Sequence, residues 1–211
     1  SRIITYGQDE TADVQGNVVS CAPFLKFTWQ ALSHQPSSGA CEVQTHLIGS
    51  YNLDNMLAAI AIGLHFGVTP QQVCHALENY IPHNNRSQLT ETAHNRLIVD
   101  AYNANPSSMA AAIENFRLMQ VKDKMAILGD MRELGAASGE EHQKVVDLLK
   151  NTGIDNVWLV GEEFGKTRTS FRKFHDVEEV KAEIARCRPE NHYILIKGSN
   201  GIKLFELPAL L

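Results

Sequence analysis

The chain of 211 residues is 44% hydrophobic and 20% charged, which is ordinary for a globular protein and enough for one large or two modest domains. Its net charge of −5 argues against a general nucleic-acid binder, because binding phosphates requires a basic surface. No apolar run reaches the length of a membrane span, and the first residues do not have the pattern of a signal peptide.

Residues 1–47 are typical of a β-rich segment, because short apolar runs alternate with clusters of Gly, Pro and Ser. The expected strands are Arg2–Tyr6, Asn17–Cys21, Phe24–Ala31 and Cys41–Leu47. The third run partly alternates between apolar and polar residues, which predicts a sheet with one face in water.

Two helices are predicted next. Apolar residues between Leu53 and Leu64 recur every three or four positions, and Gly67 follows them. The second helix is predicted by the capping-box pattern of Thr69-Pro70-Gln71-Gln72, with proline at the first helical position, and Pro82 is expected to end it.

Beyond residue 83 the pattern changes to apolar strands that alternate with helices, which favours a mostly parallel sheet with right-handed crossovers. The strands are expected to end at Asp100, Gly129, Gly161 and Gly198. One helix is expected to begin at Ser138, with Glu141 completing a capping box. The expected fold class is therefore α/β, with a Rossmann-like domain over residues 84–211, a separate unit over 1–83 and a boundary within Pro82–Arg86.

The most polar loop follows the strand that ends at Asp100. Within six residues it holds Asp100, Tyr102, Asn103 and Asn105. Open parallel sheets bind ligands beyond the carboxyl ends of their strands, and these side chains can accept from and donate to a polar ligand. Asn105 is also placed to cap the following helix, where Pro106 would be the first residue, so Asp100 and Asn103 carry more of the functional interpretation.

A second polar site opens the first predicted helix. Asn52 and Asn55 are three residues apart and would share one helix face. Two carboxamides side by side can pair with the donor and acceptor edge of a purine. The alternative is that Asn52 caps the helix while Asn55 faces solvent, and the spacing alone favours this alternative.

Two further strand ends carry charged residues. After Gly129, Asp130 and Glu133 could bind an ammonium group and Arg132 a carboxylate, although an exposed charged loop is the commoner outcome. Lys197 could hold a phosphate or a carboxylate, or be a solvated lysine.

The segment Gly161–Thr167 does not match a phosphate loop. It has three residues between its glycines instead of four, and two of them are acidic. We therefore expect a loop and a short helix there.

The four cysteines are scattered, without CxxC pairs or zinc-ligand spacing, and the nine histidines include no HxxxH pair. We expect no metal site within this chain. The thiols are expected to be reduced and mostly buried, as in a cytoplasmic protein.

Taken together, four segments resemble the C-terminal half of Mur ligases: Gly49–Asn55, Asp100–Met109, Leu128–Gly135 and Ile196–Asn200. The stretches DAYNANPSSM and GDMRELG are most similar to the branch of the family that adds D-Ala-D-Ala. The resemblance implies that residues 1–83 are the last part of a central ATPase domain and that residues 84–211 are the Rossmann-like C-terminal domain. ATP would lie between the two, and domain closure would complete the site.

The activity implied by the resemblance is ATP-dependent joining of UDP-N-acetylmuramoyl-tripeptide to D-Ala-D-Ala through an acyl phosphate, in peptidoglycan precursor synthesis. ATP and Mg²⁺ would be held mainly by a GxxGKT loop and a glutamate that this chain lacks. We therefore expect the chain alone to be inactive. We also expect it to self-associate, because an incomplete sheet exposes unpaired backbone groups.

The resemblance also implies a role for individual residues. The adenine contacts would be Asn52 and Asn55. The groups that act at the ATP ribose and phosphates, and so in catalysis, would be Arg86 and Asp100. The loop beside the nucleotide would contribute Tyr102, Asn103 and Asn105, and the incoming dipeptide would lie near Asp130, Lys197 and Ser199.

Two alternatives remain. A relative of folylpolyglutamate synthase would share the architecture, but it predicts a loop at residues 100–109 without the Asn-Ala-Asn run that this chain has. A stand-alone Rossmann-like module that binds a nucleotide or a peptide would account for the missing phosphate loop. A GxxGKT segment upstream in the reading frame would decide for the ligase.

Overall fold

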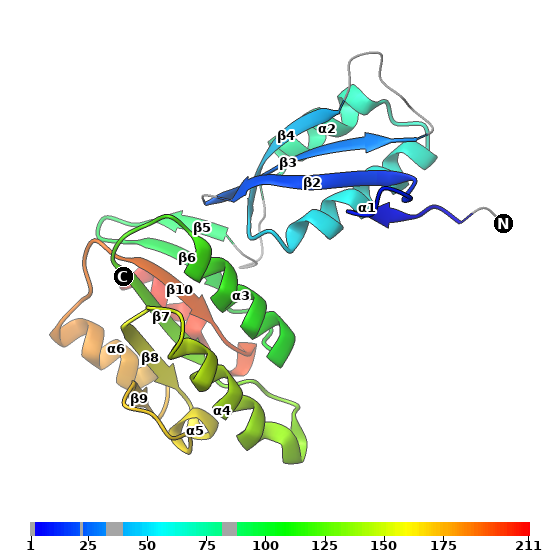
Figure 1. Cartoon of the computed structure of the whole chain (residues 1–211). Helices are drawn as coiled ribbons and strands as arrows, with labels where there is room; N and C mark the ends of the chain where they lie inside the picture. The colour runs from blue at the N-terminus through cyan, green and yellow to red at the C-terminus, as the bar shows by residue number, and fades with distance from the viewer. Residues whose placement is uncertain (1–2, 22, 33–39, 82–87) are drawn as a thin grey trace. The chain divides into compact units, whose positions relative to one another are not determined.

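The computed structural model describes residues 3–21, 23–32, 40–81 and 88–211. The chain divides into two compact units, Ser1–Pro82 and His83–Leu211, and each is described here by itself (Figure 1). The segment Pro82–Arg86, in which the sequence places the domain boundary, lies outside the described residues, and so does the candidate site residue Arg86.

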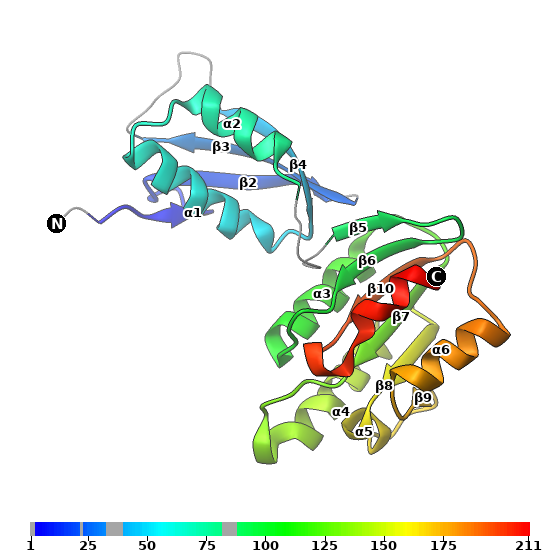
Figure 2. The same ribbon diagram turned by 180° about the vertical axis from the view of Figure 1, so that it is seen from behind.

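The described residues of the first unit form a four-stranded sheet in the order β1-β2-β3-β4, followed by two helices. The strands are β1 (Tyr6–Gly7), β2 (Val14–Cys21), β3 (Phe24–Ala31) and β4 (Cys41–Ile48), and the helices are α1 (Asn52–His65) and α2 (Pro70–Asn79). Strand β1 pairs parallel to β2, and the other neighbours are antiparallel. Both helices cover one face of the sheet (Figure 2).

Strand β3 shows why this sheet has one dry face. Leu25, Phe27 and Trp29 are at most 2% exposed and pack against α1, whereas the residues between them are more exposed. Full burial of such a side chain contributes roughly 1.5–3 kcal/mol. The alternation predicted from the sequence is therefore confirmed, and so is the capping box of α2, in which Thr69 and Gln72 bond to each other's backbone amides.

Within residues 88–211 the described elements form a six-stranded sheet in the order β5-β6-β10-β7-β8-β9. The strands are β5 (Gln88–Glu91), β6 (Arg96–Asp100), β7 (Lys124–Gly129), β8 (Asn156–Val160), β9 (Arg172–Phe174) and β10 (Tyr193–Lys197). All neighbours are parallel except β5 and β6. The helices are α3 (Pro106–Leu118), α4 (Ser138–Leu149), α5 (Glu162–Gly165) and α6 (Val177–Arg186), with 3₁₀ turns η1 (Gly135–Ala137), η2 (Asn200–Ile202) and η3 (Leu204–Ala209).

The last strand, β10, returns to the middle of the sheet between β6 and β7. Helices α3 and α4 cover one face, and α6 and η3 cover the other (Figures 1 and 2). The chain therefore leaves neighbouring strands toward opposite faces, and in open sheets ligands bind at such switch points, outside the carboxyl ends of the strands. The expected mostly parallel α/β fold is confirmed.

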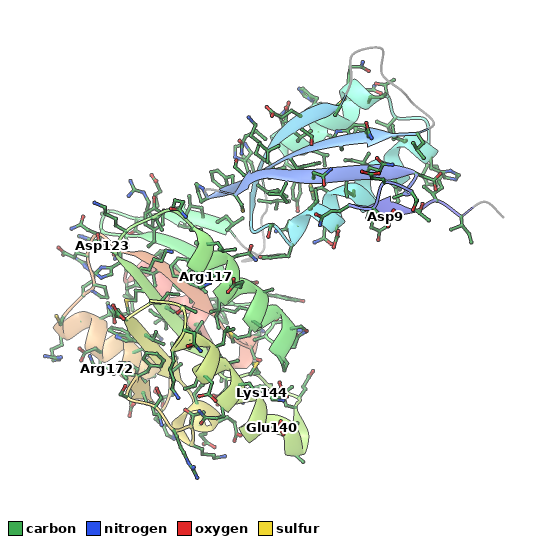
Figure 3. All side chains as sticks on the ribbon, viewed as in Figure 1. Asp9, Arg117, Asp123, Glu140, Lys144 and Arg172 are labelled. Atoms are coloured by element: carbon green, nitrogen blue, oxygen red, sulfur yellow. The ribbon has the colours of Figure 1, made fainter. Side chains whose placement is uncertain are left out.

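The outer surface of the second unit carries charged side chains such as Arg117, Lys144 and Arg172 (Figure 3). Arg172 belongs to the short edge strand β9, which the sequence analysis did not predict, as it did not predict β5. Charged residues on a short edge strand discourage pairing with other chains.

Two local predictions were wrong. The Ser138 hydroxyl does not cap α4, because the helix continues from η1 and the hydroxyl donates to Glu163 Oε2 at 2.8 Å. All four cysteines lie in the described ranges as free thiols, but none is fully buried: Cys187 is exposed and the other three are half-buried. No helix in the described part of the chain has the length and apolar character needed to cross a membrane.

Candidate functional site

Strands β6 and β10 end side by side, with Lys197 in register with Asp100. Lys197 Nζ lies 2.6 Å from Asp100 Oδ2 and donates to the Asn103 carbonyl oxygen at 3.2 Å. The Lys197 side chain is 1% exposed, whereas Asp100 is 19% exposed. A buried ammonium group is tolerated only when it is paired, so Lys197 fixes the Asp100 carboxylate at an edge that solvent still reaches.

The loop after Asp100 alternates buried and exposed residues. Ala101 and Ala104 are each 2% exposed and anchor the loop, while Tyr102 and Asn103 are exposed. The Asn103 side-chain oxygen accepts from the Ala104 amide at 2.8 Å. Asn105 caps α3 by accepting from the Ser108 amide, as predicted from its position before Pro106. The outward-facing polar groups of this loop are therefore mainly Asp100, Tyr102 and Asn103.

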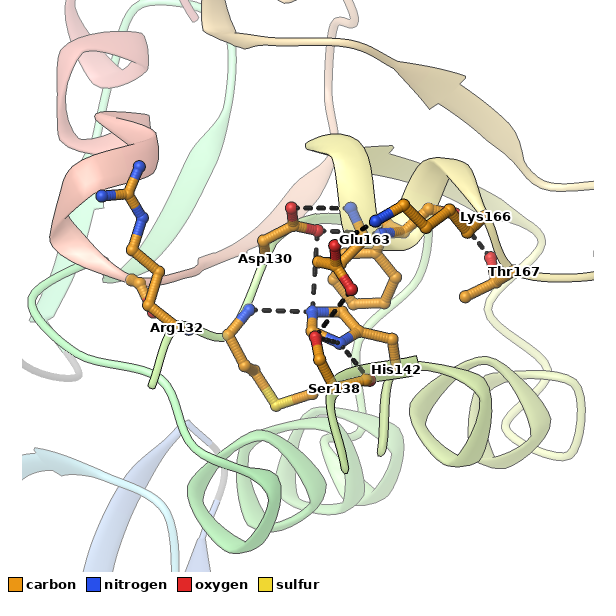
Figure 4. Close-up of polar contacts among 10 residues, drawn as sticks. Asp130, Arg132, Ser138, His142, Glu163, Lys166 and Thr167 are labelled. Atoms are coloured by element: carbon orange, nitrogen blue, oxygen red, sulfur yellow. Dashed lines mark hydrogen bonds and ion pairs between the residues drawn. The ribbon is translucent and has the colours of Figure 1, made fainter. Parts of the chain in front are cut away.

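The carboxylate that follows β7 has a different environment (Figure 4). The two oxygens of Asp130 accept from the backbone amides of Glu163 and Phe164, each at 2.9 Å. Gly161 has a φ of +122°, and a Cβ there would lie 2.3 Å from Asp130 Oδ2. The turn between β8 and α5 thus binds a carboxylate of the chain itself, which agrees with the exclusion of a phosphate loop at this segment and with the short helix expected there.

The loop after β7 and the loop after β10 are joined by hydrogen bonds. Ser199 donates from its amide to the Asp130 carbonyl oxygen at 3.1 Å, and its Oγ accepts from the Arg132 amide at 2.9 Å. The Arg132 guanidinium donates to the Gly201 carbonyl oxygen at 3.3 Å. Of the three residues expected near a dipeptide, the structure therefore brings Asp130 and Ser199 together and places Lys197 against Asp100 instead.

A cavity of about 990 Å³ opens beside these loops, and we call it the sheet-edge cavity. Its lining comes from residues 130–135, Ser138, 161–163, 175–178 and 201–203. Arg132 and Lys203 contribute positive charge to it, and the more numerous negative charges come from Asp130, Glu133, Glu162, Glu163, Asp176 and Glu178. A ligand with separate positive and negative groups suits this lining.

The sequence analysis did not identify two residues of this region: Glu163, which lines the sheet-edge cavity, and His142, which supports the turn beside it. Glu163 accepts from Lys166 and from Ser138, and these hydrogen bonds, the one from Lys166 first, hold the pKa of its carboxyl below the usual range. His142 is fully buried behind the Asp130 turn. The one available signal is the spacing of four residues between Ser138 and His142, which places both on one face of α4.

In the first unit, Asn52 and Asn55 lie on one face of α1, as predicted. Asn55 Nδ2 donates to Asn52 Oδ1 at 3.2 Å, and Asn52 Nδ2 donates to the Ile48 carbonyl oxygen at 2.8 Å. The N-cap residue is Tyr51, without a side-chain cap bond, so the capping interpretation of Asn52 was wrong. Asn52 is 8% exposed and acts as an anchor, whereas Asn55 is exposed.

The described residues contain no group of three or more His, Cys, Asp or Glu side chains that could hold a metal ion. The polar groups at the sheet edge are instead an ion pair, carboxamides and backbone amides, which suit an organic ligand.

A mostly parallel sheet with a polar switch-point edge and an adjoining cavity is the arrangement at which open α/β domains bind ligands. Residues 85–200 match the family model "Mur ligase, glutamate ligase domain". This match covers more than half of the chain, which therefore belongs to the Mur ligase family, and the family resemblance read from the sequence is confirmed.

Curated relatives carry the name UDP-N-acetylmuramoyl-tripeptide–D-alanyl-D-alanine ligase. The Escherichia coli protein is 31% identical over 82% of this chain and 39% of its own length. The Treponema pallidum protein is 29% identical over 80% of this chain and 39% of its own. A crystal structure of MurF from Acinetobacter baumannii superposes with a TM-score of 0.82 at 26% identity, covering 99% of this chain and 46% of that one. The chain spans about two fifths of the length of these curated relatives.

Proposed function

We propose that this chain is the C-terminal part of an ATP-dependent ligase that joins UDP-N-acetylmuramoyl-tripeptide to D-Ala-D-Ala in cytoplasmic peptidoglycan precursor synthesis. Its membership of the Mur ligase family and the names of its curated relatives support the proposal. The observation that carries it is the Asp100–Lys197 pair, which holds an accessible carboxylate at the switch-point edge of the sheet.

In the proposed reaction a carboxylate oxygen of the tripeptide attacks the γ-phosphorus of ATP, and ADP leaves. The amine nitrogen of D-Ala-D-Ala then attacks the acyl carbon, loses a proton and displaces phosphate. This chain would bind and orient the nucleotide and the dipeptide amine, since positioning supplies much of the rate in phosphoryl transfer. Mg²⁺ would neutralise charge on the phosphates, and no metal ligand is assigned to the described residues.

On the nucleotide side, we assign adenine to Asn52 and Asn55. The carboxamide of Asn55 is exposed and makes no other hydrogen bond within the described residues, while Asn52 holds it in place. Asp100 would accept from the ribose hydroxyls or act near the phosphates, with Arg86. The loop residues Tyr102, Asn103 and Asn105 would lie beside the nucleotide.

On the dipeptide side, we assign the sheet-edge cavity to D-Ala-D-Ala. Asp130, Lys197 and Ser199 would shape this end of the site, because each is buried and bonded to a neighbouring loop. Arg132 is exposed, and within the described residues its guanidinium bonds only the Gly201 carbonyl oxygen, so its other donors would bind the dipeptide carboxylate.

Nucleotide recognition is tested by saturation-transfer NMR on the 211-residue chain with ADP and GDP. We expect stronger transfer to ADP, because paired carboxamides match the donor and acceptor edge of adenine. Asn55→Ala should remove the preference. The matched control Gln71→Ala, exposed in the first turn of α2, should retain it. Equal transfer to both nucleotides in the unmodified chain contradicts the adenine assignment.

Ligase activity is tested with the chain alone and with the chain joined to the preceding part of the E. coli relative. We expect no turnover from the chain alone, which has no GxxGKT sequence, and amide formation from the joined protein. Turnover by the chain alone would contradict the proposal. Binding of D-Ala-D-Ala without nucleotide binding would favour the stand-alone peptide-binding module.

We also propose that the isolated chain self-associates through the outer face of α1. Ile62 of α1 and Phe66, the residue that caps the end of this helix, are 60% and 79% exposed, and neighbouring exposed apolar side chains favour association. Sedimentation velocity should show dimers that the double variant Ile62→Ser/Phe66→Ser abolishes. The control Phe205→Ser, 39% exposed in the second unit, should leave them intact. A monomer at all concentrations would exclude this proposal.

A further inference from the structure

One buried titratable side chain in the second unit takes no part in the proposed reaction. His142 on α4 is 0% exposed. Its Nε2 accepts from the Met131 amide at 3.0 Å, and its Nδ1 lies 2.7 Å from the Ser138 carbonyl oxygen. A carbonyl oxygen only accepts, so Nδ1 must carry the proton, and Nε2 must be unprotonated to accept from an amide. The two bonds therefore select the neutral Nδ1–H tautomer.

The imidazole of His142 in α4 contacts residues at the end of β7 and at the start of α5 (Figure 4). Its ring lies edge to face against Phe164 of α5, with centroids 4.7 Å apart. Nε2 is 3.6 Å from Asp130 Oδ1, whose carboxylate accepts from the first turn of α5. The end of β7 and the starts of α4 and α5 thus pack on one side chain.

The turn after β7 depends on side chains for its shape. The amides of Met131 and Arg132 are consecutive, and they donate to His142 Nε2 and to Ser199 Oγ. The turn also contains Glu133 with a φ of +67°, a left-handed conformation that a non-glycine residue adopts only when its surroundings hold it. The side chains of His142 and Ser199 therefore hold the turn after β7, whose amides at Met131 and Arg132 do not pair with backbone carbonyl oxygens of the described residues.

We propose that His142, as the neutral Nδ1–H tautomer, is a positioning residue that holds the turn Met131–Leu134 and so places Arg132 at the wall of the sheet-edge cavity. Met131 is 2% exposed, so a side chain without an acceptor at this position leaves a buried amide unpaired and the turn free to move. What Arg132 binds rests on the proposed function; the positioning itself does not. In Figure 4 the Arg132 side chain points away from the His142 cluster, toward the η2 side of the cavity.

The test uses NMR of the 211-residue chain with His142→Gln and His142→Leu. The side-chain ¹⁵N shifts of His142 in the unmodified protein should show the Nδ1–H tautomer. Glutamine can return an acceptor oxygen close to the Nε2 position, whereas leucine fills space without one. Amide hydrogen exchange at Met131 and Arg132 should accelerate on the order of tenfold in the leucine variant and return to within about threefold of the original in the glutamine variant.

Matched controls are His75→Gln and His75→Leu, at an exposed helical position of α2, which should leave both amides unchanged. An Nε2–H tautomer, or unchanged exchange in the leucine variant, overturns the proposal. If the leucine variant does not fold, the tautomer and the glutamine variant still test the proposal. The comparison is then with His142→Asn, whose shorter amide cannot reach Met131. Amide exchange at Met131 and Arg132 that is as fast in His142→Gln as in His142→Asn overturns the proposal.

A titration with D-Ala-D-Ala, followed at the Arg132 and Ser199 amides, separates this inference from the proposed function. We expect shifts in the unmodified chain, with an affinity that falls on the order of tenfold in the leucine variant and is recovered by glutamine. No shift in the unmodified chain, together with the expected tautomer and exchange rates, would support the positioning role and contradict the assignment of the dipeptide.

Discussion

Asp100 is the last residue of one buried strand and Asp130 directly follows another, at the same edge of one sheet, yet their carboxylates have different partners. Asp100 pairs with the ammonium group of Lys197 and keeps 19% of its side chain exposed. Asp130 is 9% exposed, and both of its oxygens are bonded to backbone amides of α5. One aspartate is therefore held and still accessible, whereas the other serves the fold.

The difference arises from what the neighbouring strand supplies. Beside β6 lies β10, which ends in a long cationic side chain that bonds one carboxylate oxygen, while the Asp100 side chain stays 19% exposed. Beside β7 lies β8, which ends at Val160; Gly161 follows it and precedes α5, whose amides bond both oxygens. The neighbouring strand thus decides whether the carboxylate pairs with a cation and stays partly exposed or is bonded by backbone amides of the chain itself.

The largest effect on stability is expected when Asp100 is removed. Asp100→Ala leaves the Lys197 ammonium buried without a counter-charge, which should destabilise the second unit by about 3 kcal/mol. Urea unfolding followed by Trp158 fluorescence, in a Trp29→Phe background so that only the second unit reports, measures the change.

The double variant Asp100→Ala/Lys197→Met is the control for this first prediction. It removes the stranded charge together with its partner, so most of the lost stability should return. If the double variant is as unstable as the sum of the two single variants, the ion pair is not what holds the two strand ends.

A smaller loss is expected for Asp130. Asp130→Ala leaves two backbone amides of α5 without their charged acceptor and should destabilise the second unit by about 1.5–3 kcal/mol. Asp130→Asn keeps one acceptor oxygen and should lose less. The exposed Asp155→Ala is the matched control, with a change within about 0.5 kcal/mol. Equal behaviour of Asp130→Ala and Asp155→Ala would show that the amides of α5 find other partners.

Ser199 gives a still smaller and more local effect. Ser199→Ala removes the acceptor of the Arg132 amide at a site that is 5% exposed and should cost about 1 kcal/mol. Hydrogen exchange should accelerate at Arg132 but not at Leu195 in the middle of β10. The exposed Ser170→Ala serves as the control. Faster exchange throughout β10 would indicate general loosening instead of a local contact.

The parts of this edge that the sequence could predict are the local ones. Buried strands ending at Asp100 and Gly129 have continuous apolar runs, because both of their faces are covered. The cap of α3 follows from side chains that bond amides three residues away, as does the cap of α2 in the first unit. Such interactions depend only on neighbours in the chain, so the pattern contains them.

The partners of the two aspartates could not be predicted in this way. Lys197 is 97 residues from Asp100, and nothing local indicates that β10 inserts between β6 and β7. For the same reason the Ser138 hydroxyl was assigned to its own helix, when its acceptor is Glu163, 25 residues away. The residue types pointed to a polar edge, but which carboxylate stays accessible is fixed by the order of the strands.

A third carboxylate, that of Glu183, extends the comparison to a group that pairs with two exposed arginines. Glu183 of α6 accepts from Arg172 and Arg186, and these bonds lower its pKa from the ordinary 4.5 to about 2. A lowered pKa means that the contribution to stability is complete above pH 4.5 and disappears as the pH falls toward 2. The urea concentration at the unfolding midpoint of the second unit should therefore decrease as the pH is lowered from 4.5 toward 2. It should decrease by less in Glu183→Gln, whose side chain cannot titrate.

Both arginines are exposed and screened by solvent, so the difference between the two pH profiles should be the smallest effect considered for the three carboxylates. If the urea midpoint depends on pH in the same way in Glu183→Gln and in the unmodified chain, the ion pairs of Glu183 with exposed arginines add no measurable stability. The pair of Asp100 with the buried ammonium of Lys197 would then differ from them.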